Sequence, residues 1–254
     1  MLFVDELAIL SRYAHNEGAV VQGVSFCLGE GQSLAIVGES GSGKSMIVDA
    51  IVGVLADNCR ATGKIVFDGV DLLQNGRALK KALGRQIVFV PQGGSESLNP
   101  SRKIKVQLYE ALARCGVRKN RAQMKSVALC NLAKAGLCDE SVLEKYPFEI
   151  SGGQAQRVVL ATALSANAKL IVADEATRGI DDDTARIFLD CLQKEFKDSA
   201  KIFVTHDINL AKTFDKILVV KDGRQVEYGF AEDVVNRPQN AYTAQLVQRT
   251  ASDG

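Results

Sequence analysis

The sequence predicts an α/β protein whose parallel sheet is covered by helices. Short, continuously apolar runs typical of buried parallel strands recur along the chain, and segments with helical spacing of apolar residues separate them. The composition is that of a soluble globular protein, since 46% of the 254 residues are hydrophobic and 24% are charged. The length suits one large domain or two small ones.

Strands and helices are expected to alternate through most of the chain. The expected strands are Val20–Cys27, Ser33–Val37, Lys64–Phe67, Gln86–Val90, Lys169–Ala173, Lys201–Val204, Ile217–Val220 and Arg224–Tyr228. Asp222-Gly223 joins the last two, and this dipeptide strongly favours a β-hairpin turn. The expected helices are Lys44–Leu55, Gln154–Ser165 and Asp182–Phe196.

Residues 95–146 differ from the rest of the chain because they contain few strand signals. Met124, Val127, Ala128 and Leu132 recur there at helical spacing, which we interpret as core packing. This segment is therefore expected to form a small helical subdomain inserted into the α/β core.

Charge and hydropathy exclude several classes of protein. The formal net charge is +1, so no overall positive field attracts a nucleic-acid backbone, and we expect no nucleic-acid partner. The longest apolar stretch, residues 50–56, is far too short to cross a bilayer. The first ten residues include Asp5 and Glu6 and lack a basic lead, so we expect no signal peptide. A soluble protein of cytoplasmic type is expected.

The six cysteines are interpreted as reduced, small apolar side chains. They form no Cys-x-x-Cys pair, and the chain has two histidines, so a zinc site has little support. A disulfide framework is not expected in a chain of this length without a secretion signal.

A glycine-rich segment, residues 38–45, matches the phosphate-loop pattern Gly-x-x-x-x-Gly-Lys-Ser between an apolar strand and a helix. In this pattern backbone N–H groups surround phosphate oxygens, and the positive end of the following helix adds to them. Lys44 would bridge two phosphates, and the Ser45 hydroxyl would take one Mg²⁺ position. The alternative is a Gly/Ser-rich loop without a ligand. The predicted phosphate-binding residues are Gly38, Glu39, Ser40, Gly41, Ser42, Gly43, Lys44 and Ser45.

A second apolar strand ends in the acid pair Asp174 and Glu175. Open α/β sheets bind ligands at the carboxyl ends of their strands, so both carboxylates are expected at a site. Asp174 is predicted to hold Mg²⁺, directly or through water, and Glu175 to polarise an attacking water. The alternative, an acidic helix cap, is less favoured because a phosphate loop stands earlier in the chain.

Ser151, Gly152, Gly153 and Gln154 stand before another apolar-rich helical pattern. Ser151 and Gln154 have the spacing of a capping box, so helix nucleation is one interpretation. The two glycines also leave the start of the helix without side chains, which would expose N–H groups to an anion. These residues alone leave both interpretations open.

Together these motifs resemble those of the nucleotide-binding subunits of ATP-binding cassette (ABC) transporters, including the signature Ile-Ser-Gly-Gly-Gln-Ala-Gln-Arg at residues 150–157. The resemblance covers about residues 2–248. It implies a P-loop NTPase fold with a RecA-like core, an antiparallel β subdomain and an inserted helical subdomain. A single domain over residues 1–254 would contain the core (about 1–94 and 147–230), the helical subdomain (about 95–146) and a short C-terminal helical tail (about 231–254).

The resemblance implies that residues 38–45 bind ATP and that Glu175, His206 and Gln92 are catalytic. Gln92 would sense Mg²⁺ and the membrane partner, and His206 would contact the γ-phosphate. The Mg²⁺ ligands would be Ser45, Gln92 and Asp174.

The family also implies contacts of this chain with ATP and with a second subunit. Tyr13 would stack on adenine. Residues 151–154 would contact the ATP of the partner subunit, and Asp181 would lie in the loop that crosses to that subunit.

A finer resemblance is to the peptide and nickel importer branch. Its motifs here are Leu98-Asn99-Pro100, Tyr146-Pro147-Phe148-Glu149, and Pro238 followed by Tyr242-Thr243. No cysteine follows Cys191, so the chain is expected to be more similar to the short nickel or metal-chelate members than to the longer oligopeptide members.

The resemblance therefore implies an ATPase that uses ATP and Mg²⁺ to energise a membrane importer of nickel, metal chelates or peptides. Its expected partners are two membrane-spanning permease subunits, a second and different ATPase chain, and indirectly an extracytoplasmic solute-binding protein. The expected location is peripheral, on the cytoplasmic face of the cell membrane. The residues do not specify the transported solute.

The alternative function is a non-transport ABC ATPase that acts as a cytosolic assembly scaffold. Chromosome-maintenance and ribosome-associated cassettes fit less well, because the segment between Lys44 and Ser151 has no room for a long coiled coil. One departure from the family pattern follows Glu175, where Ala176 replaces the usual proline and Arg178 is also unusual. Because proline restricts the residue before it, the loop after Glu175 is expected to be less stiff than in the family.

Overall fold

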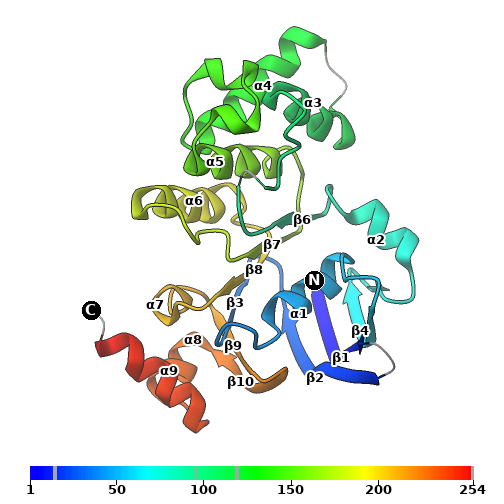
Figure 1. Cartoon of the computed structure of the whole chain (residues 1–254), viewed down its shortest axis with the longest axis vertical. Coiled ribbons are helices and arrows are strands. Elements are labelled where there is room, and N and C mark those ends of the chain that lie inside the picture. Colours follow the sequence, from blue (N-terminus) through cyan, green and yellow to red (C-terminus); the bar gives the residue numbers. More distant parts are fainter. Residues whose placement is uncertain (14–15, 95, 118–119, 253–254) are drawn as a thin grey trace. The chain divides into compact units, whose positions relative to one another are not determined.

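The computed structural model describes residues 1–13, 16–94, 96–117 and 120–252, without the side chains of residues 13, 16–17 and 250–252. The chain forms two compact units, whose elements are labelled in Figure 1. Unit 1 comprises Met1–Lys81 and Ala200–Gly254, and unit 2 comprises Ala82–Ser199.

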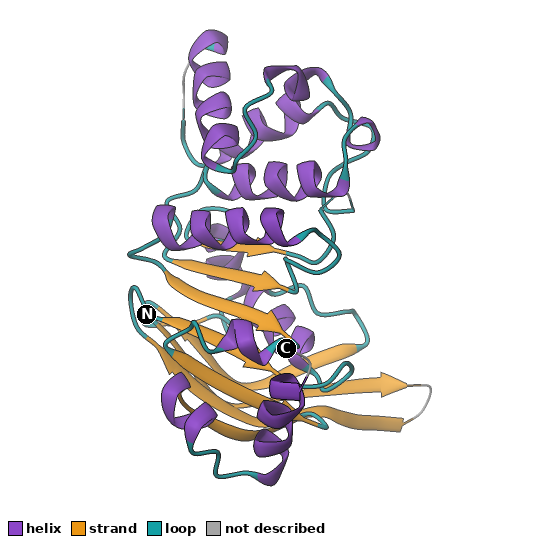
Figure 2. Ribbon diagram, turned by 90° about the vertical axis from the view of Figure 1, so that its left-hand side faces the viewer, coloured by secondary structure: helices purple, strands orange, loops and turns teal. Residues whose placement is uncertain are grey.

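The first part of unit 1 is an antiparallel sheet, which confirms the predicted antiparallel β subdomain. Its strands run side by side in Figure 2, and β1 pairs with both β2 and β4. The strands are β1 (Leu2–Tyr13), β2 (Asn16–Leu28), β4 (Cys59–Phe67) and β5 (Val70–Asp71).

Strand β1 was not predicted, because its buried side chains change parity within the strand. Leu2 and Val4 are fully buried, and Leu7 and Ile9 are buried after them. Between these pairs the ladder to β4 shifts in register, and Glu6 has a φ of 48°. A bulge of this kind turns the strand by one residue, so no simple alternation of apolar and polar residues exists along β1.

The second part of unit 1 contains the parallel strands. β3 (Ser33–Val37) lies between β8 (Ala200–Thr205) and β9 (Lys216–Lys221) and is parallel to both. β9 and β10 (Arg224–Phe230) form the predicted hairpin, in which Asp222 and Gly223 have φ values of 48° and 74°. The strand order in unit 1 is β5-β4-β1-β2-β10-β9-β3-β8.

In unit 1, α1, α2, α7 and α8 each follow a strand, and α9 follows α8 (Figure 1). α1 ends earlier than the predicted Leu55, because Gly53 adopts a left-handed conformation with a φ of 71°. α7, α8 and α9 share a hydrophobic core with β3 and β9. The helices are α1 (Lys44–Val52), α2 (Gly76–Ala82), α7 (Ile208–Ala211), α8 (Ala231–Asn236) and α9 (Ala241–Ser252).

Unit 2 consists of two parallel strands and a group of helices. The strands are β6 (Ile87–Val90) and β7 (Leu170–Asp174). The α-helices are α3 (Ile104–Arg114), α4 (Arg121–Lys134), α5 (Gly152–Ala163) and α6 (Asp182–Glu195), and the 3₁₀ helices are η1 (Glu140–Glu144) and η2 (Pro147–Glu149). α3, α4 and α5 pack against one another.

The described residues between 96 and 146 contain helices and no strand, which confirms the predicted helical insertion. Met124, Ala128 and Leu132 are buried, so the helical stripe of α4 is core packing as expected.

The prediction that the cysteines are reduced, small apolar side chains is confirmed only in part. All six are free, but Cys130 and Cys138 are exposed because they lie outside the packed faces, so the apolar interpretation is wrong for these two. Within the described ranges, no helix is long and apolar enough to cross a membrane.

Candidate functional site

The predicted phosphate loop connects β3 to α1 in unit 1. β3 is buried from Leu34 to Val37, because these residues are apolar and lie between two parallel neighbours. Gly38 follows, and a Cβ there would lie 2.1 Å from the carbonyl oxygen of Val220. Gly43 is the N-cap of α1 with a φ of 98°. The loop therefore needs glycine at both positions, and α1 begins without a capping side chain, which suits an anion.

Lys44 places a positive charge inside this loop. The residue is 4% exposed, and its Nζ donates to the carbonyl oxygens of Gly38 at 2.9 Å and Glu39 at 2.7 Å. A third contact joins Nζ to Ser42 Oγ at 3.4 Å. Ser45, the next residue, is exposed, so its hydroxyl is accessible to solvent.

His206 lies at the same edge of the unit 1 sheet as the phosphate loop. Val37 pairs with Thr205 at the carboxyl ends of β3 and β8, and Gly38 and His206 are the residues that follow them. His206 is exposed. The Asp207 N–H donates to Thr205 Oγ1 at 3.0 Å, and Asp207 caps α7, so the backbone is held after His206. Unit 1 thus brings together two of the predicted site regions.

The acid pair ends the buried strand β7 in unit 2. Asp174 is 8% exposed, and Glu175 follows it with a φ of 41°, a region that non-glycine residues rarely adopt. Arg178 contacts Glu175 twice. Its backbone N–H donates to the Glu175 carbonyl oxygen at 2.9 Å, and its Nη1 lies 2.7 Å from Glu175 Oε2. The unusual arginine of this loop therefore holds the carboxylate of Glu175.

Gln92 follows β6 and is exposed. Because Val90 pairs with Ala173 in the parallel strands β6 and β7, Gln92 and Asp174 lie at the same edge of this strand pair. The loop after Gln92 packs against α5 by its backbone, since a Cβ on Gly94 would lie 2.4 Å from the Gln156 nitrogen. Unit 2 thus places the Gln92 loop beside the acid pair and against the helix that follows Ser151.

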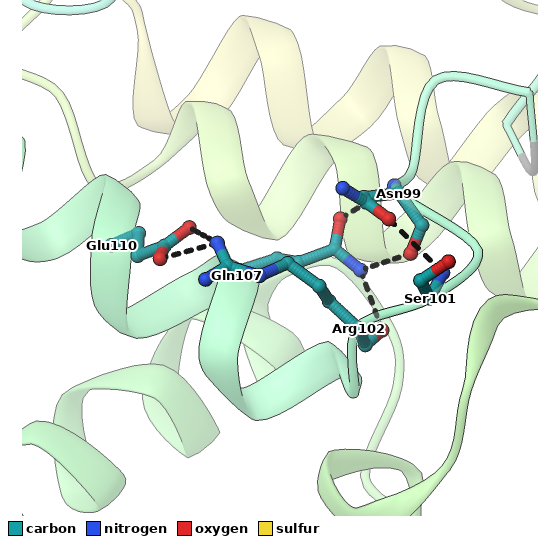
Figure 3. A network of polar contacts seen from close by, with 5 residues as sticks. All are labelled: Asn99, Ser101, Arg102, Gln107 and Glu110. Atoms are coloured by element: carbon teal, nitrogen blue, oxygen red, sulfur yellow. Dashed lines mark hydrogen bonds and ion pairs between the residues drawn. The ribbon is translucent and has the colours of Figure 1, made fainter.

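The Leu98-Asn99-Pro100 motif is held by a polar network (Figure 3). The Gln107 side chain accepts from the Asn99 N–H at 2.9 Å and donates to the carbonyl oxygens of Asn99 and Arg102 at 3.1 and 2.9 Å. Asn99 Oδ1 accepts from the Ser101 N–H at 3.0 Å, and Arg102 pairs with Glu110. This network ties the end of the Gln92 loop to α3.

Ser151 and Gln154 form the predicted capping box of α5. Ser151 Oγ accepts from the Gln154 N–H at 3.2 Å, and Gln154 Oε1 accepts from the Ser151 N–H at 3.0 Å. A Cβ added to the intervening Gly152 would meet no atom within 4 Å, so the start of α5 is open on that side. Helix nucleation is thus observed, and an anion-binding role of Gly152 and Gly153 remains compatible with it.

Asp181 is the N-cap of α6, and a polar chain connects it to α5. Its carboxylate accepts from the Thr184 N–H at 2.9 Å and from the Thr184 hydroxyl at 2.8 Å. These hydrogen bonds, with the backbone one first, lower the pKa of Asp181. Arg157 in α5 donates to Thr184 Oγ1 at 2.7 Å and to the Gly136 carbonyl oxygen at 3.1 Å. Within unit 2, Arg157 therefore connects α5, the helix that begins after Ser151, to Asp181 through Thr184.

Comparison with known proteins decides the family. A family model described as ABC transporter matches residues 21–178. The metal-staphylopine import system ATP-binding protein CntD of Staphylococcus aureus is 34% identical over 97% of this chain and 92% of its own length. The chain belongs to the ABC transporter family. The oligopeptide transport ATP-binding protein OppD of Bacillus subtilis is also similar to this ABC ATPase, with 36% identity over 96% of this chain and 70% of OppD.

A solved structure gives the same result for the fold of this ABC ATPase. It is a dimeric ATP-binding cassette in a post-hydrolysis state bound to ADP and Pi, with a TM-score of 0.81 and 27% identity over 91% of this chain and 99% of that one. The predicted fold class, family and ATPase activity are therefore confirmed, and the importer names of the relatives support the predicted transport function.

Sequence analysis missed several residues that hold the candidate site of this ABC ATPase. They are Thr184 and Arg249, together with Arg157, Arg178 and Tyr242, which the motifs included but to which the sequence assigned no contact with the site. The spacing of Asp181 and Thr184 is that of a helix N-cap and could have signalled one of them. The Tyr13 side chain lies outside the described residues, so its stacking role stays a prediction.

Proposed function

We propose that this chain is the ATP-hydrolysing subunit of a membrane importer whose solute is nickel, another metal chelate or a peptide. The observation that carries the proposal is the ammonium of Lys44, held inside the loop formed by residues 38–45. In an ABC ATPase a fixed cation at this point favours the β- and γ-phosphates of ATP. The relatives CntD and OppD, named as import and transport proteins, support the solute classes.

In this proposal, unit 1 supplies the phosphate-binding groups. Lys44 releases the carbonyl oxygens of Gly38 and Glu39 and donates to phosphate oxygens, while the N–H groups of the loop and of α1 surround them. His206, at the same edge of the sheet, contacts the γ-phosphate. Tyr13 stacks on the adenine ring.

Mg²⁺ suits the oxygen atoms of the proposed ligands. Ser45 offers an exposed hydroxyl, Asp174 a carboxylate at the end of a buried strand, and Gln92 an exposed amide oxygen. Hydroxyl, carboxylate and amide oxygens are hard ligands of the type that Mg²⁺ takes in nucleotide sites. When bound, the ion neutralises charge on the phosphate oxygens.

Glu175 acts as the general base. Its carboxylate accepts a proton from a water whose oxygen attacks the γ-phosphorus. The bond from phosphorus to the bridging oxygen breaks, and the products are ADP and inorganic phosphate. Arg178 keeps the carboxylate of Glu175 in one orientation, because it binds Oε2 and the carbonyl oxygen of the same residue.

The remaining motif residues act on partners. Ser151, Gly152, Gly153 and Gln154 contact ATP held by a second ATPase chain, which is a different polypeptide, and Asp181 lies in the loop that crosses to it. The proposed assembly includes two permease subunits and, indirectly, an extracytoplasmic solute-binding protein. The chain, as a single nucleotide-binding domain, lies peripherally at the cytoplasmic face of the membrane.

The nucleotide site is tested by direct titration with a fluorescent ATP analogue. Lys44→Ala is expected to abolish or severely weaken binding, because backbone amides do not replace the lost charge. The matched control is Lys80→Ala, which removes the same charge from an exposed position of α2. Unchanged affinity in Lys44→Ala would contradict the assignment of residues 38–45.

The base and the transport function need two further measurements. Glu175→Gln keeps the shape of the side chain and removes the base, so it should bind ATP without hydrolysing it. For transport, the genes beside that of this chain are identified, permease genes found there are co-expressed with it, and uptake of labelled nickel chelate and labelled peptide is measured. If the cells take up one of the two solutes and the Lys44→Ala variant abolishes that uptake, the importer function is supported. If uptake does not depend on ATP, or if neither solute is taken up, the importer function is contradicted.

A further inference from the structure

The C-terminal helix α9 contacts the phosphate loop at Glu39. The hydroxyl of Tyr242 accepts a hydrogen bond from the Glu39 backbone N–H at 3.0 Å. Arg249, further along α9, places Nη1 2.9 Å from Glu39 Oε1. Two groups from one helix therefore hold the backbone and the side chain of the same loop residue.

Tyr242 is fixed by the core of unit 1, whereas Arg249 is not. The Tyr242 residue is 8% exposed and belongs to a hydrophobic cluster that includes Val37 and Val219. Its N–H donates to Asn240 Oδ1 at 2.8 Å, and Lys221 Nζ lies 4.8 Å from the centre of its ring. The Arg249 side chain is 70% exposed. The hydroxyl of Tyr242 is thus a rigid contact, and the Arg249 pair is a weak, solvent-screened one.

The contact on Glu39 also reaches Lys44. The Glu39 carbonyl oxygen accepts from Lys44 Nζ at 2.7 Å and from the Ser42 N–H at 3.2 Å. Tyr242 binds the N–H of the peptide group that precedes the Cα of Glu39. Lys44 and Ser42 bind the carbonyl oxygen of the peptide group that follows it. The orientation of the carbonyl that receives the Lys44 ammonium therefore depends on a hydroxyl from α9.

We propose that Tyr242 is a positioning residue for ATP, whose hydroxyl holds the phosphate loop in its binding conformation. This inference rests on the proposed ATP-binding role of residues 38–45. Without the hydroxyl, the first peptides of the loop have more conformations to lose when ATP binds, so affinity falls. Saturating ATP restores the ordered loop, so kcat is kept. Because coupling is reciprocal, ATP also stabilises the docking of α9.

The experiment compares Tyr242→Phe with Tyr228→Phe in the full-length chain. Tyr228 is the matched control, since its hydroxyl donates to the Cys27 carbonyl oxygen at 2.8 Å in unit 1 and is not bonded to the phosphate loop. Tyr242→Phe should raise the Kd of a fluorescent ATP analogue and the KM for ATP about three- to tenfold, the effect of one hydrogen bond, with kcat within about twofold. Tyr228→Phe should keep both constants, even if thermal unfolding shows that each variant is less stable.

A second variant and a hydrogen-exchange measurement distinguish the role of Tyr242 from that of Arg249 and from a general loss of stability. Arg249→Ala should raise Kd by about twofold or less, because its ion pair is exposed. In the unmodified chain, hydrogen exchange of the α9 amides should slow when ATP is added, and this protection should shrink in Tyr242→Phe. Lys44→Ala is measured in the same series. If Lys44→Ala still binds ATP, the proposed function fails; if it loses ATP while Tyr242→Phe has the Kd and KM of Tyr228→Phe, the inference about Tyr242 alone is overturned.

Discussion

Gly94→Ala is predicted to separate the Gln92 loop from α5. A Cβ at this position would lie 2.4 Å from the nitrogen and 2.8 Å from the Cα of Gln156, and 2.9 Å from the carbonyl carbon of Ala155. All three are backbone atoms of a helix, so no side-chain rotation relieves the overlap. Ordinary contact begins at 3.4 Å, so the loop must move by about 1 Å.

The size of the effect follows from this displacement. Overpacking of this kind costs roughly 1–3 kcal/mol of stability, and each kcal/mol lowers Tm by about 2–4 °C in a chain of this size. Hydrolysis should fall as well, because moving a group near the reacting atoms by about 1 Å can reduce the rate on the order of a hundredfold. ATP affinity should change little, since Lys44 and the phosphate loop belong to unit 1.

The assay measures ATP hydrolysis, binding of a fluorescent ATP analogue and thermal unfolding for Gly94→Ala and a control. Gly76→Ala is the control, since a Cβ there meets no atom within 4 Å. A Gly94→Ala variant with unmodified Tm and unmodified hydrolysis would refute the close packing of the Gln92 loop. If Gly94→Ala abolished ATP binding as completely as hydrolysis, the explanation that it lowers hydrolysis by displacing Gln92 would be refuted.

The other predictions concern the loop after Glu175 and the thiols. Arg178→Ala should lower kcat by up to about fivefold, because the carboxylate of Glu175 loses its fixed orientation, and Arg178→Lys should recover part of it; a rise in kcat would contradict this. If the loop accepts proline without strain at Glu175, whose φ is 41°, Ala176→Pro should raise steady-state hydrolysis by a few-fold at most, about the effect of 0.4–1 kcal/mol, and an unmodified enzyme that is inactive until proline is introduced would show that estimate to be wrong. Burial raises the pKa of Cys191 to about 11, so alkylation near pH 8, followed by mass spectrometry, should modify the exposed Cys130 first; equal rates would contradict the burial.

Local patterns predicted the parts of the fold whose cause is local. The turn at Asp222-Gly223 was predicted because two positive φ values are needed within two residues, and both are present. The buried strands β3, β7 and β8 were predicted from continuous apolar runs, and each of them pairs with a parallel strand in its own unit. β1 was missed because the bulge at Glu6 depends on its pairing with β4, which no local pattern reports.

The residues of the candidate site also fall into two groups: those that a local motif predicts and those that it does not. The phosphate-loop and acid-pair motifs are short and contiguous, so Lys44, Asp174 and Glu175 could be proposed from spacing, whereas the ATP contact of Ser151 was implied only by the family resemblance. The groups that hold them are distant in the chain or depend on a side-chain orientation. Tyr242 is an example, because its contact with Glu39 exists only once α9 has packed on the core of unit 1.

The capping box of α5 limits which residues can replace Ser151. Its hydroxyl accepts from the Gln154 N–H, and the same hydroxyl still has a proton to donate to a phosphate oxygen. Aspartate is as good a helix cap as serine, but its carboxylate has no proton to donate and repels phosphate. Alanine neither caps the helix nor donates a hydrogen bond. Serine, threonine and asparagine can cap a helix and still donate a proton, whereas aspartate cannot donate; under the proposed function, Ser151→Asp would therefore keep the helix and remove one contact to the ATP of the partner subunit. Under the proposed function, the residue at this turn must therefore satisfy two chains: its own helix needs the cap, and the nucleotide of the partner needs the donor.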